Sequence, residues 1–162
     1  HGVHRRQRQM CIRDSLALAR FQGVKRRMEI LASCEDYVIY DDFAHHPTEI
    51  FKTLSSLREK IGNDQIIAVI EPRSRTMQSG LHDKEMAKAL SPADSVIWYE
   101  GQDVKRSMSA ELKKAKAEVY FAANISEIIQ ITHQIKTTKS NIVIMSNGDF
   151  SGLRELIKKE LD

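Results

Sequence analysis

Residues 40–49, with the sequence YDDFAHHPTE, say more about the fold than any other part of this chain. The apolar, strand-like stretch 37–40 leads directly into two carboxylates and two imidazoles. Pro47 suits the first position of a helix, where its missing N–H would have no partner, and Glu49 complements the positive end of that helix. In an open α/β sheet, ligands bind where parallel strands end. This stretch therefore predicts a strand, a candidate binding site and a helix, in that order.

Strand and helix patterns alternate along the rest of the chain. Strands that alternate with helices form parallel βαβ units in one sheet, so we expect an α/β fold. The polar link 34–36 between the first two strands predicts a β-hairpin. The expected strands are 28–33, 37–41, 66–70, 95–99, 118–122 and 141–145; the expected helices are 15–21, 47–60, 82–90, 108–116, 125–135 and 153–161.

Polar side chains gather in four loops that follow the expected strands. Because the carboxyl ends of parallel strands lie at one edge of a sheet, several of these loops can line a single crevice. The four loops are 41–46, 71–80, 100–107 and 146–152.

The composition is that of an ordinary globular domain, since 41% of the 162 residues are hydrophobic and 29% are charged. No apolar run approaches the roughly 18–20 residues of a membrane span, and no signal peptide is visible. Cys11 and Cys34 have neither metal-binding nor redox spacing, which favours free thiols in a reducing cytoplasm.

The net charge of +3 comes from residues 1–14, which contain four arginines and one aspartate. The rest of the chain carries equal numbers of acidic and basic side chains, so it offers no support for nucleic-acid binding. Residues 1–14 also lack apolar periodicity. We interpret residues 1–14 as a non-native or disordered leader and residues 15–162 as the folded domain.

The polar side chains at the end of the second strand allow two interpretations. Asp42 and His45 have the chemistry of a ribose-hydroxyl acceptor and a ligand-facing imidazole. Alternatively, Asp41 and His46 cap the helix and the other two are hydrogen-bonded locally. A zinc site is not expected, because the two histidines are adjacent and no third ligand has diagnostic spacing.

Three further loops contain candidate anion-binding groups. The basic turn 25–27 can clamp a phosphate or simply be solvated. Arg73 and Arg75 suit recognition of a carboxylate, although they can equally form surface ion pairs. Ser146 and Asn147 can hold an anion together with backbone N–H groups, or they form a plain turn before the last helix.

The chain lacks the motifs of a self-sufficient catalyst. It contains no Gly-x-x-x-x-Gly-Lys-Ser/Thr phosphate loop, no nucleophile elbow and no visible serine or cysteine triad. A complete catalytic apparatus is therefore not expected in this sequence alone.

Two sequence blocks, GVKRRME at 23–29 and DDFAHHPT at 41–48, resemble the C-terminal domain of the Mur ligases. These are ATP-dependent amide-forming enzymes of bacterial peptidoglycan metabolism. The resemblance runs from about residue 15 to the C-terminus, and His-His-Pro is its most specific motif. It implies a Rossmann-like, mostly parallel sheet of about six strands flanked by helices, with an N-terminal β-hairpin.

Mur ligases have three domains, and this chain resembles the third alone. The central domain carries the phosphate loop, which explains why that motif is missing here. The resemblance implies that ATP phosphorylates the carboxylate of a UDP-N-acetylmuramoyl substrate and that an amine attacks the acyl phosphate. Mg²⁺ is expected to be held mainly by the central domain, and no metal site is expected in this chain. The isolated chain is expected to be inactive.

The resemblance also implies roles on the ATP side of the site. Arg27 matches the arginine that reaches the ATP phosphates. Asp42 matches the aspartate that accepts from the ribose hydroxyls. His45 matches the first histidine of the motif, near ATP or the incoming amine, and is our candidate catalytic residue.

Other matching positions are implied to bind the amine substrate. Arg73 and Arg75 resemble arginines that hold the carboxylate of that substrate. Ser146 and Asn147 lie where the family closes the amine-substrate pocket. Phe43 stands where the alanine-adding relative usually has tyrosine, so any contact that depends on a hydroxyl is lost.

The loops EPRSRTM at 71–77 and MSNG at 145–148 most resemble the family member that recycles cell-wall tripeptide. We therefore expect a ligase that joins UDP-N-acetylmuramate to L-alanyl-γ-D-glutamyl-meso-diaminopimelate. It is expected to act in the bacterial cytoplasm, with its own N-terminal and central domains as partners and with neither nucleic acid nor membrane. Two alternatives remain: the third domain of the alanine-adding ligase, and a non-catalytic nucleotide-binding module.

Overall fold

The computed structural model describes residues 25–73, 83–101 and 108–161 of the chain. Residues 1–14, interpreted as a leader, and the expected helix 15–21 lie outside this part. The strands are β1 (Glu29–Ser33), β2 (Tyr37–Asp42), β3 (Gln65–Ile70), β4 (Ser95–Tyr99), β5 (Glu118–Ala122) and β6 (Ser140–Met145). The helices are α2 (Pro47–Ile61), α4 (Asp83–Ala89), α5 (Ser109–Leu112), α6 (Ile125–Ile135) and α7 (Leu153–Leu161), with a short 3-10 helix, η1 (Phe150–Gly152).

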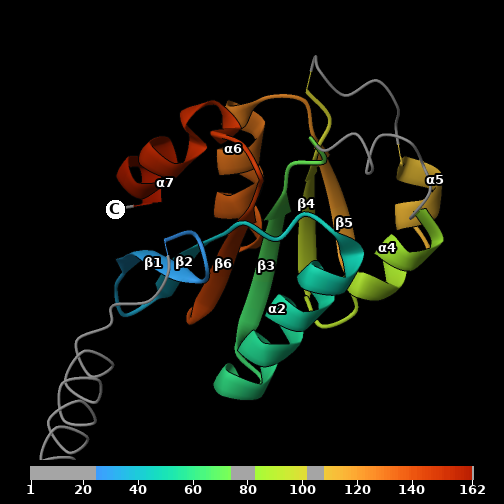
Figure 1. Cartoon of the computed structure of the whole chain (residues 1–162). Helices are drawn as coiled ribbons and strands as arrows, with labels where there is room; N and C mark the ends of the chain where they lie inside the picture. The colour runs from blue at the N-terminus through green and yellow to red at the C-terminus, as the bar shows by residue number, and fades with distance from the viewer. Residues whose placement is uncertain (1–24, 74–82, 102–107, 162) are drawn as a thin grey trace, which may run out of the picture.

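One six-stranded sheet, in the order β1-β2-β6-β3-β4-β5, lies between two layers of helices (Figure 1). The β1–β2 pair is antiparallel, and every other neighbouring pair is parallel. This arrangement confirms the expected α/β fold with an N-terminal hairpin. It also brings the carboxyl ends of the parallel strands to one edge of the sheet.

The two faces of the sheet bury alternate residues of each central strand, as the pleat requires. In β3, Ile66, Ala68 and Ile70 pack under α2, α4 and α5. Ile67 and Val69 point the other way, toward α6 and α7. A strand that is covered on both faces reads as a continuous apolar run, which explains the pattern of 66–70.

Helix α2 begins as its sequence predicts. Pro47 is at its first turn, and the ring of His46 accepts a hydrogen bond from the Thr48 N–H at 3.3 Å. Glu49 lies in the first turn, where a carboxylate is favoured. The helix ends at Gly62, whose φ of 66° is in the region that favours glycine and whose N–H bonds to the Arg58 carbonyl.

Helix α5 is shorter than the expected helix 108–116, which was wrong at its C-terminal end. Leu112 is its last buried apolar residue, and lysines occupy 113, 114 and 116. The N–H groups of Lys114 and Ala115 bond three residues back, to Glu111 and Leu112. The chain therefore tightens into turns of the 3-10 type after Leu112, where two exposed lysines follow. The other described elements agree with the expected bounds to within one residue.

Candidate functional site

The ends of β2, β6 and β3 lie next to one another at the carboxyl edge of the sheet. Asp42 pairs with Met145, which also pairs with Ile70. The next residues continue the contact, because the Ser146 N–H bonds to the Asp42 carbonyl and the Glu71 N–H to the Met145 carbonyl. The loops that follow these three strands are therefore brought together, as predicted.

The Asp42 carboxylate is only 2% exposed and holds three neighbouring segments together. It accepts hydrogen bonds from the N–H groups of Met28 and Ala44, at 2.9 and 2.8 Å, and from the hydroxyl of Thr53 at 3.4 Å. A carboxylate offers about four acceptor positions, and hydrogen bonds from the described residues occupy three of them. The interpretation that Asp42 is hydrogen-bonded locally thus accounts for three of the acceptor positions of its carboxylate.

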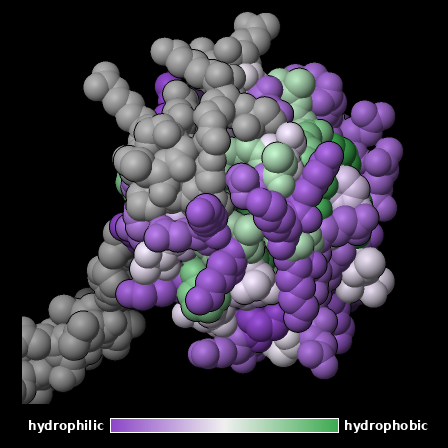
Figure 2. Space-filling view, turned by 90° about the vertical axis from the view of Figure 1, so that its right-hand side faces the viewer, coloured by the Kyte–Doolittle hydropathy of each residue, from purple (hydrophilic) through white to green (hydrophobic). Residues whose placement is uncertain are grey.

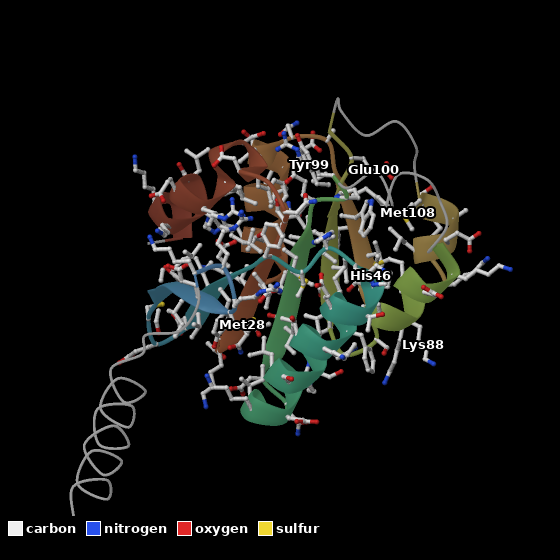
Figure 3. The ribbon with its side chains drawn as sticks, in the orientation of Figure 1. Met28, His46, Lys88, Tyr99, Glu100 and Met108 are labelled. Carbon is white, nitrogen blue, oxygen red and sulfur yellow. The ribbon has the colours of Figure 1, made fainter. Side chains whose placement is uncertain are left out.

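The two histidines have different surroundings, and Figure 3 shows His46 at the beginning of α2. His46 caps α2, as one of the interpretations held, whereas Asp41 does not. His45 is half-buried, with Nδ1 3.0 Å from the Phe43 carbonyl and 3.6 Å from the Glu49 carboxylate. When Nδ1 donates to that carbonyl, Nε2 is left as an acceptor for a ligand. The ring also meets Phe43 edge-on at 5.5 Å.

The basic turn 25–27 separates its two arginines. Arg26 has a φ of 57°. Its guanidinium lies over the Phe43 ring, 4.9 Å from the centroid, and also donates to the Gly148 carbonyl in the 146–149 loop. Arg27 is exposed, with its guanidinium 5.9 Å from the same ring. The turn therefore directs one arginine into the fold and leaves the other on the surface.

Arg27 and Asp42 line the same cavity, of about 420 Å³, between the hairpin and α2. Lys52 and Lys60 bring two further cations to its wall, and Met28 contributes apolar surface. Figure 3 shows Met28 beside the hairpin, on the side that faces α2. The full lining is Arg27, Met28, Ile30, Tyr40, Asp42, Lys52, Thr53, Ser56, Leu57 and Lys60. Cations around a partly apolar floor suit a ligand that combines phosphates with a ring.

Tyr40 closes the base of this cavity. Burial raises the pKa of its hydroxyl, so the phenol stays neutral. The hydroxyl donates to the Asn141 amide oxygen at 3.4 Å.

Ser146 is fully buried, and its hydroxyl is used within the protein. The hydroxyl donates to the Glu71 carboxylate and accepts from the Gly148 N–H at 2.9 Å. Ser146 therefore shapes the loop and has no second O–H to offer a substrate. The side-chain oxygen of Asn147 is buried and has no hydrogen-bond partner within the described residues.

Arg73 follows β3, is exposed and lies against Gly148. A Cβ built on Gly148 would be 2.5 Å from an Arg73 guanidinium nitrogen, so this close approach needs a glycine. Arg75, the second predicted carboxylate-binding arginine, lies outside the described residues.

Sequence reasoning missed a network that joins Asp41, Arg26 and Arg154. The Arg154 Nε donates to the Asp41 carboxylate at 2.8 Å, and the Arg26 Nε lies 3.4 Å from its other oxygen. Arg154 belongs to no motif, and its partner is 113 positions away in the sequence. The only available signal was that Asp41 is a carboxylate at the end of a buried strand.

Another feature, a groove bordered by lysines, lies away from this edge. Lys84, Lys88, Lys114 and Lys116 border a groove between α4 and α5, and Figure 2 shows hydrophilic side chains standing over much of this face. Among the described residues, no group of three or more histidine, cysteine or acidic side chains is placed to hold a metal ion. None of the described helices is long and apolar enough to cross a bilayer.

Known proteins resemble this chain in sequence and in structure. It is 35% identical over 146 residues to the UDP-N-acetylmuramate–L-alanyl-γ-D-glutamyl-meso-2,6-diaminoheptandioate ligase of Haemophilus influenzae, covering 90% of this chain and 32% of that one. It is 49% identical over 138 residues to the UDP-N-acetylmuramate–L-alanine ligase of Streptococcus agalactiae, covering 82% and 30%. The crystal structure of a murein peptide ligase from Psychrobacter arcticus superimposes with a TM-score of 0.78 at 34% identity, covering 90% and 32%.

The chain spans about a third of the length of these relatives. The family model described as "Mur ligase, glutamate ligase domain" matches residues 26–148. The match includes residues 26–29 of the first sequence block, the whole second block at 41–48, and all of the sheet from β1 to β6. The chain therefore belongs to the Mur ligase family, of which it contains the C-terminal domain.

Proposed function

We propose that this chain is the third domain of a ligase that joins UDP-N-acetylmuramate to the tripeptide L-alanyl-γ-D-glutamyl-meso-diaminopimelate. ATP would activate the sugar carboxylate as an acyl phosphate, and the incoming amine would displace phosphate. The main support is the cavity that Arg27 and Asp42 line together, which offers cations and one free carboxylate position on the same wall. The similarity to tripeptide-specific relatives supports the choice of substrate.

On the ATP side, the residues present fit a nucleoside triphosphate. Arg27 is exposed at the rim of the cavity and can form paired hydrogen bonds to phosphate oxygens. The remaining acceptor position of Asp42 suits a ribose hydroxyl. His45 does not line this cavity, but its ring contacts Phe43, as Arg27 does, and its Nε2 acceptor suits contact with ATP or with the amine. Magnesium belongs to the central domain in this proposal.

On the amine side, Arg73 and Arg75 hold the carboxylate of the incoming substrate in our proposal. Arg73 already lies against Gly148 in the 146–149 loop. Ser146 acts through the shape of that loop, because its hydroxyl is bound to Glu71. The aromatic ring of Phe43 forms the boundary between the two sides, since Arg26, Arg27 and His45 all contact it.

The remaining parts of the reaction belong to the rest of the enzyme. The phosphate loop and the UDP-sugar site are assigned to the central and N-terminal domains, with which this domain closes. Closure excludes water, which would hydrolyse the acyl phosphate. We place the enzyme in the bacterial cytoplasm, without nucleic-acid or membrane partners, and we expect the isolated chain to have no ligase activity.

A second candidate is the alanine-adding ligase. It is favoured by the 49% identity to the Streptococcus agalactiae enzyme, which exceeds the identity to the tripeptide ligases compared above. A non-catalytic nucleotide-binding module is the third alternative, and it would lack turnover with either amine.

ADP release by the full-length parent enzyme separates these candidates. It is measured with UDP-N-acetylmuramate and ATP, offering either the tripeptide or L-alanine, with the isolated chain as the negative control. Turnover with the tripeptide alone supports the proposal, whereas turnover with L-alanine alone replaces it with the second candidate.

Substitution of Arg75 by alanine in the same enzyme tests the amine side. Loss of one bidentate carboxylate contact raises the KM for the amine substrate by roughly ten- to a hundredfold, from about 1.5–3 kcal/mol. The KM for ATP is expected to stay within about twofold. A larger effect on ATP would contradict the assignment of this loop.

A further inference from the structure

The loop 146–149 is held from inside the fold by two arginines that come from distant parts of the chain. Arg26 donates to the carbonyls of Ser146 and Gly148, the latter at 2.9 Å. Arg154, in the first turn of α7, donates to the carbonyls of Gly148 and Asp149 at 3.2 and 2.6 Å. Three carbonyls of a four-residue loop are therefore occupied by guanidinium groups.

Asp41 joins the two arginines. Its side chain is 3% exposed, and its two oxygens face Arg154 Nε at 2.8 Å and Arg26 Nε at 3.4 Å. The hydrogen bond from Arg154 Nε fixes the plane of that guanidinium, whereas Arg26 Nε, which has no hydrogen-bond partner within the described residues, is attracted to the same carboxylate by its charge. The position of each arginine, and so of the carbonyls it binds, depends on this one buried side chain.

Asn147 is the residue that this arrangement constrains most. It lies between Ser146 and Gly148, whose carbonyls are both bound by Arg26. Because peptide groups are planar, the bond from Arg26 to the Ser146 carbonyl fixes the peptide group before Asn147, and the Gly148 N–H, which donates to the Ser146 hydroxyl at 2.9 Å, fixes the one after it. Its side-chain oxygen is buried and has no hydrogen-bond partner within the described residues, and the next residue, Gly148, lies against Arg73.

We infer that Asp41, Arg26 and Arg154 are positioning residues for the amine substrate, and that they act by holding Asn147 in place. This inference rests on the proposed function for the identity of the substrate. An unpartnered amide oxygen is a hydrogen-bond acceptor suited to an ammonium or amine group. The network contacts neither ATP nor the amine itself in this arrangement, so its effect on catalysis is indirect.

The requirement for arginine rather than positive charge makes the inference testable. Lysine at position 154 can still pair with Asp41, but its donors share one nitrogen and cannot reproduce the spacing between Arg154 Nε, which binds Asp41, and Nη1, which binds the two carbonyls. Arg58 provides a matched control, because it also binds carbonyls and a carboxylate, those of Pro92, Gly62 and Asp94. It does so away from the carboxyl edge, in the turns that precede β3 and β4.

The first readout is backbone hydrogen exchange of this chain, with variants Arg154→Lys and Arg58→Lys. We expect exchange of the amides in 147–150 to accelerate at least tenfold in Arg154→Lys and to be unchanged in Arg58→Lys. Unchanged exchange in both variants would overturn the inference, whatever reaction the enzyme performs. If Arg154→Lys fails to fold, Arg26→Lys tests the same fork from the other side.

The second readout is steady-state kinetics of the full-length enzyme carrying the same substitutions. We expect Arg154→Lys to raise the KM for the amine substrate at least tenfold, with the KM for ATP within twofold, and Arg58→Lys to change neither. Equal losses for both substrates would indicate a merely structural role and overturn the inference. If the wild-type enzyme uses L-alanine instead of the tripeptide, the proposed function fails, and the same split is measured with L-alanine.

Discussion

Opposite ends of the sheet use the same chemistry in different surroundings. At the carboxyl edge, Arg26 and Arg154 share Asp41, whose side chain is 3% exposed. At the amino edge, Arg58 pairs with Asp94, whose side chain is 49% exposed, and binds the carbonyls that precede β3 and β4. In both places a guanidinium fork and a carboxylate fix the shape of a loop.

The difference between the two networks lies in the cost of losing a partner. A charged group in the interior that loses its partner remains desolvated, whereas a charged group at the surface that loses its partner is solvated by water. The carboxyl-edge network therefore makes the loop beside the candidate site rigid but sensitive to substitution. The amino-edge network ties turns that line no candidate site described above, and it tolerates change.

Substitution of Asp41 by alanine is expected to have the largest effect. It leaves Arg26 and Arg154 next to each other without their shared carboxylate, and removal of one partner from a buried pair costs about 3–5 kcal/mol. The measurement is urea unfolding of this chain, followed by circular dichroism. A loss below about 1 kcal/mol would show that water reaches this network as easily as the one at the other end.

Substitution of Asp94 by alanine is expected to cost about 1–2 kcal/mol in the same assay. Its carboxylate accepts from Arg58 at 2.6 Å and from the Ile66 N–H at 2.7 Å, but water replaces much of both interactions because the side chain is half exposed. The share of this cost that comes from the ion pair between Arg58 and Asp94 should decrease in high salt, since exposed charges are screened. A cost equal to that of Asp41→Ala would remove the distinction between the two ends.

Two glycines sharpen the comparison at the level of single atoms. Gly62 needs its positive φ and has open space around it, so Gly62→Ala is expected to lower stability by about 1 kcal/mol without affecting substrate binding. Gly148 is limited by space instead, because an added Cβ would meet the Arg73 side chain. Arg73 can move, so Gly148→Ala should cost at most about 0.5 kcal/mol.

The order of the two substitutions is reversed for substrate binding, where Gly148→Ala is expected to have the larger effect. A displaced Arg73 no longer lies beside the 146–149 loop, so Gly148→Ala is expected to raise the KM for the amine substrate in the full-length enzyme several-fold. Gly62→Ala serves as the control that changes stability alone. Equal KM values for the two variants would contradict a role for Arg73 in holding the amine substrate.

Most of the fold could be predicted from the sequence because its signals are local. The apolar runs of β3 and β6, the proline at the start of α2 and the spacing of Ile50, Leu54 and Leu57 each act over a few residues. The expected end of α5 was wrong for the complementary reason. Lysine is a good helix former, but a helix this short depends on burial, and the residues directly after Leu112 are the exposed Lys113 and Lys114.

The candidate site was predictable in place but not in detail. The segments that carry Asp42, His45, Arg73 and Ser146 all lie at the ends of β2, β3 and β6, which are neighbours at the carboxyl edge of the parallel sheet. The sequence did not reveal that the Ser146 hydroxyl is already bound to Glu71. Local patterns carry no information about a partner 75 positions away.

By itself, the sequence determined the strands, the helices, the mostly parallel sheet and the edge at which polar groups collect, because these follow from burial patterns repeated along short segments. Only the tertiary structure decided between neighbours of the same chemistry. Consecutive strand residues point to opposite faces, so Asp41 meets Arg154 of α7 while Asp42 meets Thr53 of α2. Which helix covers which face is set by the crossing of distant segments, and that choice gives two equally buried neighbouring carboxylates different partners.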